Sequence, residues 1–250
     1  MKIIWKIYQK DIDDIKLFLK SQENNDFVKE RIIRNLASTK PKISKSVFWK
    51  RHVACLLTTQ QKSGPGGPVD SFLKSNPFIL NYNKCCEQDE LQYDAEKCLS
   101  SAGGLRFARN ISEYIANNHD AMEHLFWARV SPMLDELRGQ HDPAYERKVA
   151  HYIAKHLKGY GPKQSRNLLQ WLGLTQYEIP LDSRIINWFN NWHFPVVLSA
   201  KALSDPHYYE FILEGIQQLC ARCDVFPCVL DAAIFSSVDE SKKLPKALPS

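Results

Sequence analysis

Apolar side chains recur every three to four residues along most of the chain, which is the spacing of one buried face of an α-helix. Strict alternation of apolar and polar residues, typical of strands, is scarce. The sequence therefore predicts an all-α fold. The individual helices are expected over residues 11–19, 27–36, 47–60, 105–115, 147–157, 183–192 and 209–219.

The strongest local pattern is a helical segment that is interrupted by two glycines and then resumes. The helix expected to end near residue 157 is followed by Gly159 and Gly161. Pro162 suits the first turn of a new helix, where the missing N–H costs nothing. Gly173 is expected to end that second helix. The pattern predicts a helix–hairpin–helix over residues 155–172.

Such a hairpin has two interpretations. Glycines have no Cβ, so a backbone phosphate can approach them, and the free N–H groups at the start of the second helix can bind that phosphate. An ordinary corner between two packed helices would show the same pair of glycines. The hairpin alone leaves both interpretations open.

An aspartate follows the hairpin at a position where it can cap another helix. Asp182 comes just after Ile179-Pro180, which favours extended chain, and just before the amphipathic segment 183–192. Helix N–H groups would hold its carboxylate ionised. Lys163 stands nineteen residues earlier, directly after the hairpin. A lysine and an ionised carboxylate together can do chemistry at a sugar carbon.

Positive charge is concentrated in two windows of the sequence. The net charge is only +5, yet residues 38–69 and 147–177 contain no Asp or Glu. Concentrated positive charge beside a phosphate-binding turn favours a DNA-binding protein over a chain with merely solvated helix faces. The basic residues of the two windows are Lys40, Lys42, Lys45, Lys50, Arg51, Lys62, Arg147, Lys148, Lys155, Lys158, Lys163 and Arg166.

These residues resemble the helix-hairpin-helix DNA glycosylases, the superfamily of endonuclease III and the 8-oxoguanine DNA glycosylases. The family motif is a G-x-G-x-K hairpin and, about nineteen residues later, an aspartate in a V/L-D-x-R/H setting. Gly159, Gly161, Lys163 and Asp182 match it in type and spacing. The resemblance covers roughly residues 47–192.

Two fainter matches lie upstream in the expected order. The segment LLTTQ at 56–60 is similar to the LLSxQ end of a helix whose glutamine enters the DNA near the lesion. The segment GLRFARNI at 104–111 is similar to a G-x-x-x-x-K-A-x-x-I helix start. Arg109 stands in place of the lysine there, and the alanine and isoleucine are out of register.

The resemblance implies a two-lobed all-α fold with the active site in the cleft between the lobes. Residues 1–46 and 174–250 would form a terminal helical lobe. Residues 47–173 would form a central helical barrel that ends in the helix–hairpin–helix.

The resemblance also implies base excision with strand cleavage. Lys163 would attack C1′ of the damaged nucleotide, and Asp182 would stabilise the cationic sugar. The expected activity is that of a bifunctional DNA glycosylase and abasic-site lyase acting on an oxidised base, with 8-oxoguanine favoured. The alternatives are an endonuclease III-like enzyme for oxidised pyrimidines, or a non-catalytic DNA-binding protein in which Lys163 only contacts phosphate.

The same resemblance nominates further residues. Aromatic candidates for stacking on an extruded base are Trp127, Trp171, Phe226 and Phe235. The Gly/Pro loop at 63–68 is expected to be a rigid connection that can touch the duplex. The expected DNA contacts are Gln60, Gln61, Gly159, Tyr160, Gly161, Arg166 and Arg184.

Seven cysteines, an odd number, suit a reducing compartment. Many relatives of endonuclease III hold a [4Fe–4S] cluster with the spacing C-x6-C-x2-C-x5-C. Cys220, Cys223 and Cys228 are similar to the last three positions, but Leu213 occupies the first and the final gap is four. Three thiolates make a poor cluster site. We therefore expect no metal and no cofactor, and interpret these cysteines as small buried apolar residues.

The remaining expectations concern location and partners. No apolar run reaches eighteen residues and no signal-peptide pattern opens the chain. We expect an intracellular monomer, in the cytoplasm or nucleoid of a prokaryote or the nucleus of a eukaryote. Its expected partner is double-stranded DNA with a damaged base, and no membrane. The segment 241–250 is expected to be a frayed tail.

Overall fold

The computed structural model describes residues 4–59, 61 and 66–241, with the backbone alone at 239–241. Within these residues the chain is all-α, as predicted, with thirteen α-helices, one 3-10 helix and no strand. The frayed tail expected at 241–250 falls almost wholly outside them. The helices are α1 Gln9–Gln22, α2 Asp26–Asn35, α3 Lys45–Leu57, α4 Pro68–Leu73, α5 Tyr82–Cys86, α6 Leu91–Ser101, α7 Ala108–Glu123, α8 Phe126–Gly139, α9 Pro143–His156, α10 Pro162–Trp171, α11 Ser183–Asn191, η1 Ala202–Ser204, α12 Pro206–Arg222 and α13 Pro227–Ser241.

The helix ends follow the local signals in the sequence. Asp182 caps α11 by accepting hydrogen bonds from two backbone N–H groups, and Pro162 is the first residue of α10. Gly173 adopts a positive φ of 74° just after α10, which ends that helix as expected. The helix expected over 105–115 instead spans Ala108–Glu123, because Phe107 takes a left-handed conformation at the helix start. Helices α4, α5, α6, α8 and α13 were not specified by the sequence pattern.

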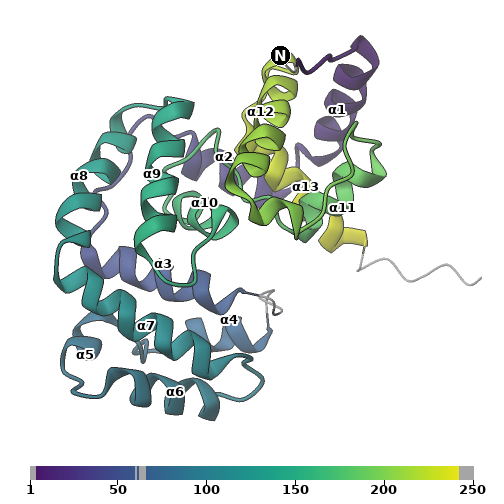
Figure 1. The fold of residues 1–250 in the computed structure, drawn as a ribbon. Coiled ribbons are helices and arrows are strands. Elements are labelled where there is room, and N and C mark those ends of the chain that lie inside the picture. Colours follow the sequence, from purple (N-terminus) through teal and green to yellow (C-terminus); the bar gives the residue numbers. More distant parts are fainter. Residues whose placement is uncertain (1–3, 60, 62–65, 242–250) are drawn as a thin grey trace, which may run out of the picture.

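The buried apolar side chains gather in two clusters. The first runs from Ile43 to Leu174 and is built from α3 to α10. The second combines Ile12 to Val28 near the N-terminus with Ile179 to Ile234 near the other end. Figure 1 shows α1 and α2 beside α11, α12 and α13, with α3 to α10 forming the other part of the molecule.

We propose that the two clusters are the cores of two lobes, with the boundaries inferred above at 1–46 with 174–250 and at 47–173. Ile43 and Leu174 pack in the first cluster, a few residues beyond those boundaries. The polypeptide crosses between the clusters just after α2 and again just after α10. No helix in the described part of the chain has both the length and the apolar character needed to cross a lipid bilayer.

Candidate functional site

The hairpin between α9 and α10 is fastened to α7 and α3. Asn118 on α7 forms a reciprocal pair of hydrogen bonds with the Lys158 backbone, accepting from its N–H at 2.7 Å and donating to its carbonyl at 2.9 Å. The Tyr160 hydroxyl donates to the His52 carbonyl at 3.1 Å, and the two rings stack with centroids 5.3 Å apart. The turn is therefore held in one place relative to the first cluster.

The two glycines of the hairpin have different roles. Gly159 has a φ of +79°, and a Cβ there would lie 2.7 Å from the Tyr114 ring and 2.8 Å from Leu56. Glycine is needed at that position for packing inside the protein. Gly161 has an extended backbone, and a Cβ there would meet nothing within 4 Å. Only Gly161 has room for a Cβ, whereas the Gly159 backbone is exposed but turns its side-chain direction into the protein.

Lys163 lies in the first turn of α10, half-buried. Its Nζ donates to Gln164 Oε1 at 3.3 Å, and Gln164 in turn donates to the Cys55 carbonyl at 2.9 Å. Burial lowers the pKa of Lys163 from its usual value, while the negative charge of Asp182 acts in the opposite direction. The ammonium and the carboxylate are therefore within electrostatic reach of each other, and burial is the larger effect.

The loop from 174 to 178 that leads towards Asp182 is organised around a buried carboxylate. Glu146 of α9 is fully buried, and its Oε2 accepts from the N–H groups of Tyr177 and Glu178, both at 2.9 Å. Its Oε1 accepts from the Gln176 N–H at 2.8 Å. Burying a charged group is costly unless it is paired and hydrogen-bonded, and this loop supplies hydrogen bonds to the carboxylate.

The second half of the same loop is fixed by a buried ion pair and a tyrosine. Arg166 Nε lies 2.6 Å from Glu178 Oε2, with both side chains at most 1% exposed. The Tyr209 hydroxyl accepts from the Leu181 N–H at 2.7 Å and donates to the Ile179 carbonyl at 2.8 Å. Because both ends of the loop are tied to α9, α10 and α12, Asp182 is delivered to a defined position.

Asp182 combines capping with exposure. Its Oδ1 accepts from the backbone N–H groups of Arg184 at 2.8 Å and Ile185 at 3.2 Å. The Arg184 guanidinium lies 3.5 Å from Oδ2, and the carboxylate side chain is 27% exposed. An anion at the N-terminus of a helix is stabilised by the helix dipole. The carboxylate is held in place and still reachable from outside.

The lysine and the aspartate come from opposite sides of the junction between the two clusters. Lys163 is on α10, whose Leu168 and Leu169 belong to the first cluster. Asp182 starts α11, whose Ile185 belongs to the second cluster. The arrangement brings an amine of lowered pKa and an N-capping carboxylate within electrostatic reach at the junction between the two clusters.

A second carboxylate near this pair was not found from the sequence. Asp231 of α13 is 6% exposed, and its Oδ2 accepts from Arg31 at 2.6 Å and from Gln170 at 2.9 Å. Burial raises the pKa of Asp231, Arg31 opposes that effect and Asp182 adds to it, while the charge of Asp231 raises the pKa of Lys163. The sequence feature that indicates a buried carboxylate here is a single acidic residue in the otherwise apolar segment VLDAAIF at 229–235.

Several expected DNA contacts are corrected by the structure. Arg166 is buried in its ion pair with Glu178, and the Tyr160 side chain is buried against His52, so neither side chain reaches a duplex. Only the backbone at Tyr160 remains available for a phosphate. Gln61 uses its amide within the protein, donating to the Leu57 carbonyl and accepting from the Arg106 N–H. Gln60 lies outside the described residues, as does the 63–65 part of the Gly/Pro loop.

The aromatic candidates for a base pocket fall in different places. Trp127 is on α8, which packs against α9, and its ring contacts Phe48 edge-on. Trp171 follows Lys163 by two helical turns on α10, about 12 Å along the axis. Both pack against the first cluster. These two positions support the core and not a pocket at Lys163.

Of the two phenylalanines, Phe226 packs against the second cluster, and Phe235 is half-buried on α13. Phe226 contacts Tyr177 edge-on with centroids 5.6 Å apart. Phe235 stacks on Phe27 at 4.6 Å, and the Arg184 guanidinium carbon lies 3.9 Å from the centre of the Phe235 ring. Phe235 is thus one helical turn from Asp231 and touches the arginine that neighbours Asp182. Among the four candidates, it is the one that the contacts connect to the Lys163 and Asp182 pair.

The two acid-free windows are only partly available to DNA. Arg147 pairs with Glu178 and with Glu210 and Glu214 of α12, and Lys40 is buried. Lys62 lies outside the described residues. The side chains that remain exposed are Lys42, Lys50, Arg51, Lys148, Lys155 and Lys158. The electrostatic surface is therefore smaller than the sequence suggested, and near the hairpin it includes Lys155 and Lys158 at the end of α9.

The three clustered cysteines are buried in the second cluster, in accord with the interpretation as small apolar residues. Burial raises the pKa of Cys228 to about 12 and raises that of Cys223. Burial also raises the pKa of Cys220 well above its usual value. Thiols of this kind are protonated and unreactive at neutral pH.

Comparison with known proteins identifies the fold. No protein-family model matches the sequence, and no curated protein matches it. Solved structures do match. One is the 8-oxoguanine DNA glycosylase Tm1821 of Thermotoga maritima, with a TM-score of 0.63 and 12% sequence identity. The match covers 92% of this chain and 96% of the Tm1821 chain. The 8-oxoguanine DNA glycosylase of Methanocaldococcus jannaschii matches with a TM-score of 0.64 and 17% sequence identity. The match covers 93% of this chain and 96% of the glycosylase chain.

The third structure is the Methanocaldococcus jannaschii 8-oxoguanine glycosylase/lyase in complex with a 15mer DNA containing 8-oxoguanine. It matches with a TM-score of 0.64 and 18% identity, covering 94% of this chain and 98% of its own. The chain therefore has the all-α helix-hairpin-helix fold of these glycosylases along almost its whole length.

Proposed function

We propose that the protein is a DNA glycosylase with an associated abasic-site lyase activity. One observation carries the proposal. Lys163, an amine whose pKa is lowered by burial, follows a fastened hairpin directly and lies within electrostatic reach of the exposed N-capping carboxylate of Asp182. The fold shared with three glycosylase structures supports this reading.

The first part of the reaction breaks the bond between base and sugar. A duplex hides C1′, so the damaged nucleotide must be extruded from the stack before it can react. As the N-glycosidic bond breaks, its electron pair leaves with the base and the sugar acquires positive charge. The fixed carboxylate of Asp182 stabilises that charge, and it needs no reorganisation to do so because helix N–H groups already hold it.

The second part uses the amine. Neutral Lys163 forms a bond to C1′ and loses a proton. The C1′–O4′ bond then breaks, its electron pair goes to O4′, which takes up a proton, and a protonated imine with the opened sugar results. Removal of a C2′ proton then expels the 3′ phosphate and cleaves the strand. The lowered pKa of Lys163 raises the fraction of neutral amine at physiological pH above that of an exposed lysine.

For the damaged base we propose 8-oxoguanine. The three matching structures carry that lesion in their names, and one of them holds DNA containing it. Phe235 supplies an aromatic face, provided that the Arg184 guanidinium moves off its ring. Buried Asp231, one helical turn away on α13, supplies a hydrogen-bond acceptor. An oxidised pyrimidine remains the second candidate.

The proposed partner is duplex DNA with a damaged base, bound by a monomer inside the cell. Gly161 and the first turn of α10 would receive one phosphate. The exposed lysines Lys155 and Lys158, on either side of the α9 terminus, would contact neighbouring phosphates.

Borohydride trapping on an oligonucleotide with one 8-oxoguanine tests the proposal. The wild-type chain should form one covalent complex, and Lys163→Gln should form none while keeping DNA affinity within a few-fold. Lys158→Gln is the matched control, since Lys158 is exposed on the same hairpin and should still trap. Asp182→Asn retains the cap and removes the charge, so excision should fall by about 10²–10³-fold.

Two results would contradict the assignment. Crosslinking by Lys163→Gln at wild-type yield would show that another amine is the nucleophile. Binding to damaged DNA without any excision or trapping by the wild-type chain would favour the non-catalytic alternative, in which the hairpin only grips the duplex.

A further inference from the structure

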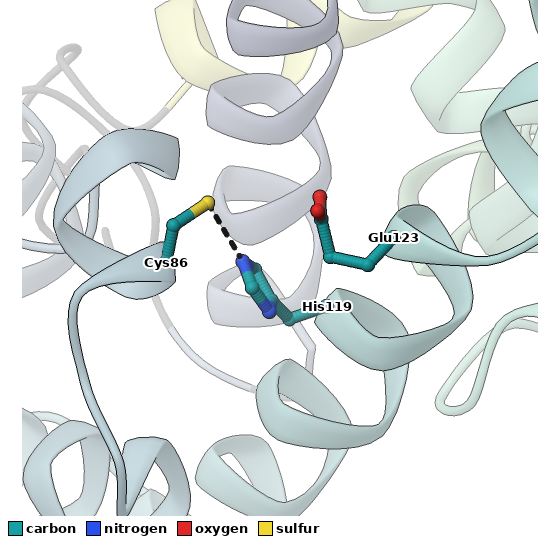
Figure 2. Close-up of side chains that lie close together, drawn as sticks. All are labelled: Cys86, His119 and Glu123. Atoms are coloured by element: carbon teal, nitrogen blue, oxygen red, sulfur yellow. Dashed lines mark hydrogen bonds between the residues drawn. The ribbon is translucent and has the colours of Figure 1, made fainter.

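A second group of chemically capable side chains lies between α5 and α7, apart from the Lys163 and Asp182 pair. Cys86 is the last residue of α5, and His119 and Glu123 are four residues apart on α7. Figure 2 shows the three side chains pointing towards a common space. A thiol, an imidazole and a carboxylate are the three donor types that bind zinc in proteins.

The distances suit a single ion. Cys86 Sγ lies 3.4 Å from His119 Nε2, and all three donor atoms lie within 4.8 Å of one another. A tetrahedral zinc with bonds of about 2.0–2.3 Å holds its ligand atoms roughly 3.5 Å apart. The sulfur and the imidazole nitrogen already have that separation. A small rotation of the Glu123 side chain, which is exposed, brings the third donor to the same distance.

The imidazole is held in place by neighbouring rings. Trp49 packs edge-on against His119 with centroids 5.4 Å apart, and Tyr82 lies against it at 5.2 Å. Tyr82 is only 8% exposed, and its hydroxyl has no hydrogen-bond partner among the described residues. A buried hydroxyl without a partner beside the histidine indicates a site whose polar surroundings are incomplete in the protein alone.

Carboxylates outnumber ammonium groups around the three side chains, and Lys45 is the cation that contacts one of them. The three side chains line an open pocket of about 690 Å³, and no Lys or Arg is among its lining residues. Lys45 bonds Glu123 Oε1 at 2.7 Å, which leaves the other carboxylate oxygen for a metal. Outer partners of this kind commonly orient a metal-binding carboxylate. The carboxylates that line the pocket are Asp89, Glu90, Glu96, Asp120 and Glu123.

We propose that Cys86, His119 and Glu123 form a zinc site with three protein ligands and a fourth position open to the pocket. The thiolate excludes the hard cations Mg²⁺ and Ca²⁺, which take oxygen ligands. Zinc here ties α5 to α7, one residue from Asn118, the side chain that holds the hairpin. The expectation of no metal rested on Cys220, Cys223 and Cys228. Cys86 and His119 lie 33 positions apart in the sequence, and only the fold brings them together.

Cobalt substitution of the full chain tests the proposal without any DNA. One equivalent of Co²⁺ should give the near-ultraviolet absorption of a thiolate–cobalt bond, and one equivalent of Zn²⁺ should remove it. Cys86→Ser should abolish the absorption, and His119→Gln should weaken Zn²⁺ binding at least tenfold. Cys98→Ser and Glu96→Gln are matched controls, because Cys98 is a half-exposed thiol on α6 and Glu96 lines the same pocket. Both should bind like the wild type.

Thermal unfolding without metal shows whether each variant folds. Cys86→Ser should unfold at the wild-type temperature in chelator and should lose the stabilisation that zinc gives the wild-type chain. Absence of stoichiometric Zn²⁺ binding by the wild type would overturn the proposal. So would equal binding by folded Cys86→Ser, since the sulfur would then not be a ligand. Neither result depends on whether Lys163 cleaves DNA.

Discussion

The two glycines of the hairpin give the sharpest test of the candidate site, because one substitution should damage the fold and the other should damage only DNA binding. In Gly159→Ala the new methyl group enters a space already filled by the Tyr114 ring and Leu56. In Gly161→Ala the same methyl group enters open space.

The expected cost at Gly159 follows from the geometry. A left-handed φ of +79° disfavours alanine by about 1–2 kcal/mol. The Cβ contacts at 2.7 and 2.8 Å are far below the ~3.5 Å at which carbon atoms pack, and relieving them adds about 1–3 kcal/mol. The free energy of unfolding should fall by about 2–5 kcal/mol. At about 2–4 °C per kcal/mol, the melting temperature should drop by roughly 4–20 °C.

Gly161→Ala is the control, since its φ of −116° is ordinary for alanine. Its stability should match the wild type within about 0.5 kcal/mol. Its affinity for duplex DNA should nevertheless fall for every sequence and lesion, because the methyl group occupies the approach path of the phosphate. Calorimetric melting and fluorescence anisotropy on one undamaged duplex measure both quantities for both variants.

The reasoning fails in two distinguishable ways. If Gly159→Ala melts with the wild type, the packing of the hairpin against Tyr114 and Leu56 is wrong. If Gly161→Ala binds DNA with wild-type affinity, the open face of the hairpin is not where the phosphate lies. The second result would leave the fold intact and remove the hairpin from the proposed DNA surface.

Four further predictions concern the whole protein. With roughly four to six phosphate contacts, the logarithm of DNA affinity should fall against the logarithm of salt concentration with a slope of about −4 to −5, and a slope near zero would remove the electrostatic argument. Single-turnover excision should be faster for 8-oxoguanine than for thymine glycol in matched duplexes; the reverse order would assign the enzyme to the endonuclease III type. Because Cys220, Cys223 and Cys228 lack a fourth ligand, the purified protein should be colourless and free of stoichiometric iron, and a broad visible absorption with four irons per chain after anaerobic purification would refute this. The rate at which a preformed abasic site is cleaved should increase with pH and level off below the usual lysine pKa of about 10.4, because burial lowers the pKa of Lys163 and the neutral amine is the reactive form. Asp182→Asn removes the negative charge that opposes this lowering, so its pH profile should shift to lower pH. A profile in that variant that does not move, or that moves to higher pH, would contradict the proposed pairing of Lys163 with Asp182.

The sequence by itself determined the features that depend on neighbours along the chain. Apolar spacing gave the all-α class, and Pro162, Gly173 and Asp182 marked where helices begin and end. Capping and helix periodicity act over a few residues, so they can be read without knowing the packing. The hairpin and the spacing from Lys163 to Asp182 belong to this local information.

The tertiary structure alone decided which of the named side chains face the surface. Arg166 looked like a DNA contact because it is basic and close to the hairpin, but Glu178 and the Tyr209 ring cover its guanidinium. Tyr160 is turned inward onto His52 in the same way. A basic or aromatic residue has the same neighbours in the sequence whether its side chain is buried or exposed. Whether it can reach DNA depends on its contact partner, which for Arg166 is 12 residues away and for Tyr160 is 108 residues away.

Groupings across long sequence distances were also invisible beforehand. Asp231 meets Arg31 across 200 positions, and Cys86 meets His119 across 33. Each contact exists because apolar faces of different helices pack together and carry their polar neighbours with them. Helix periodicity says that a face is buried but not against which other helix, and that choice is made by side-chain packing between distant segments.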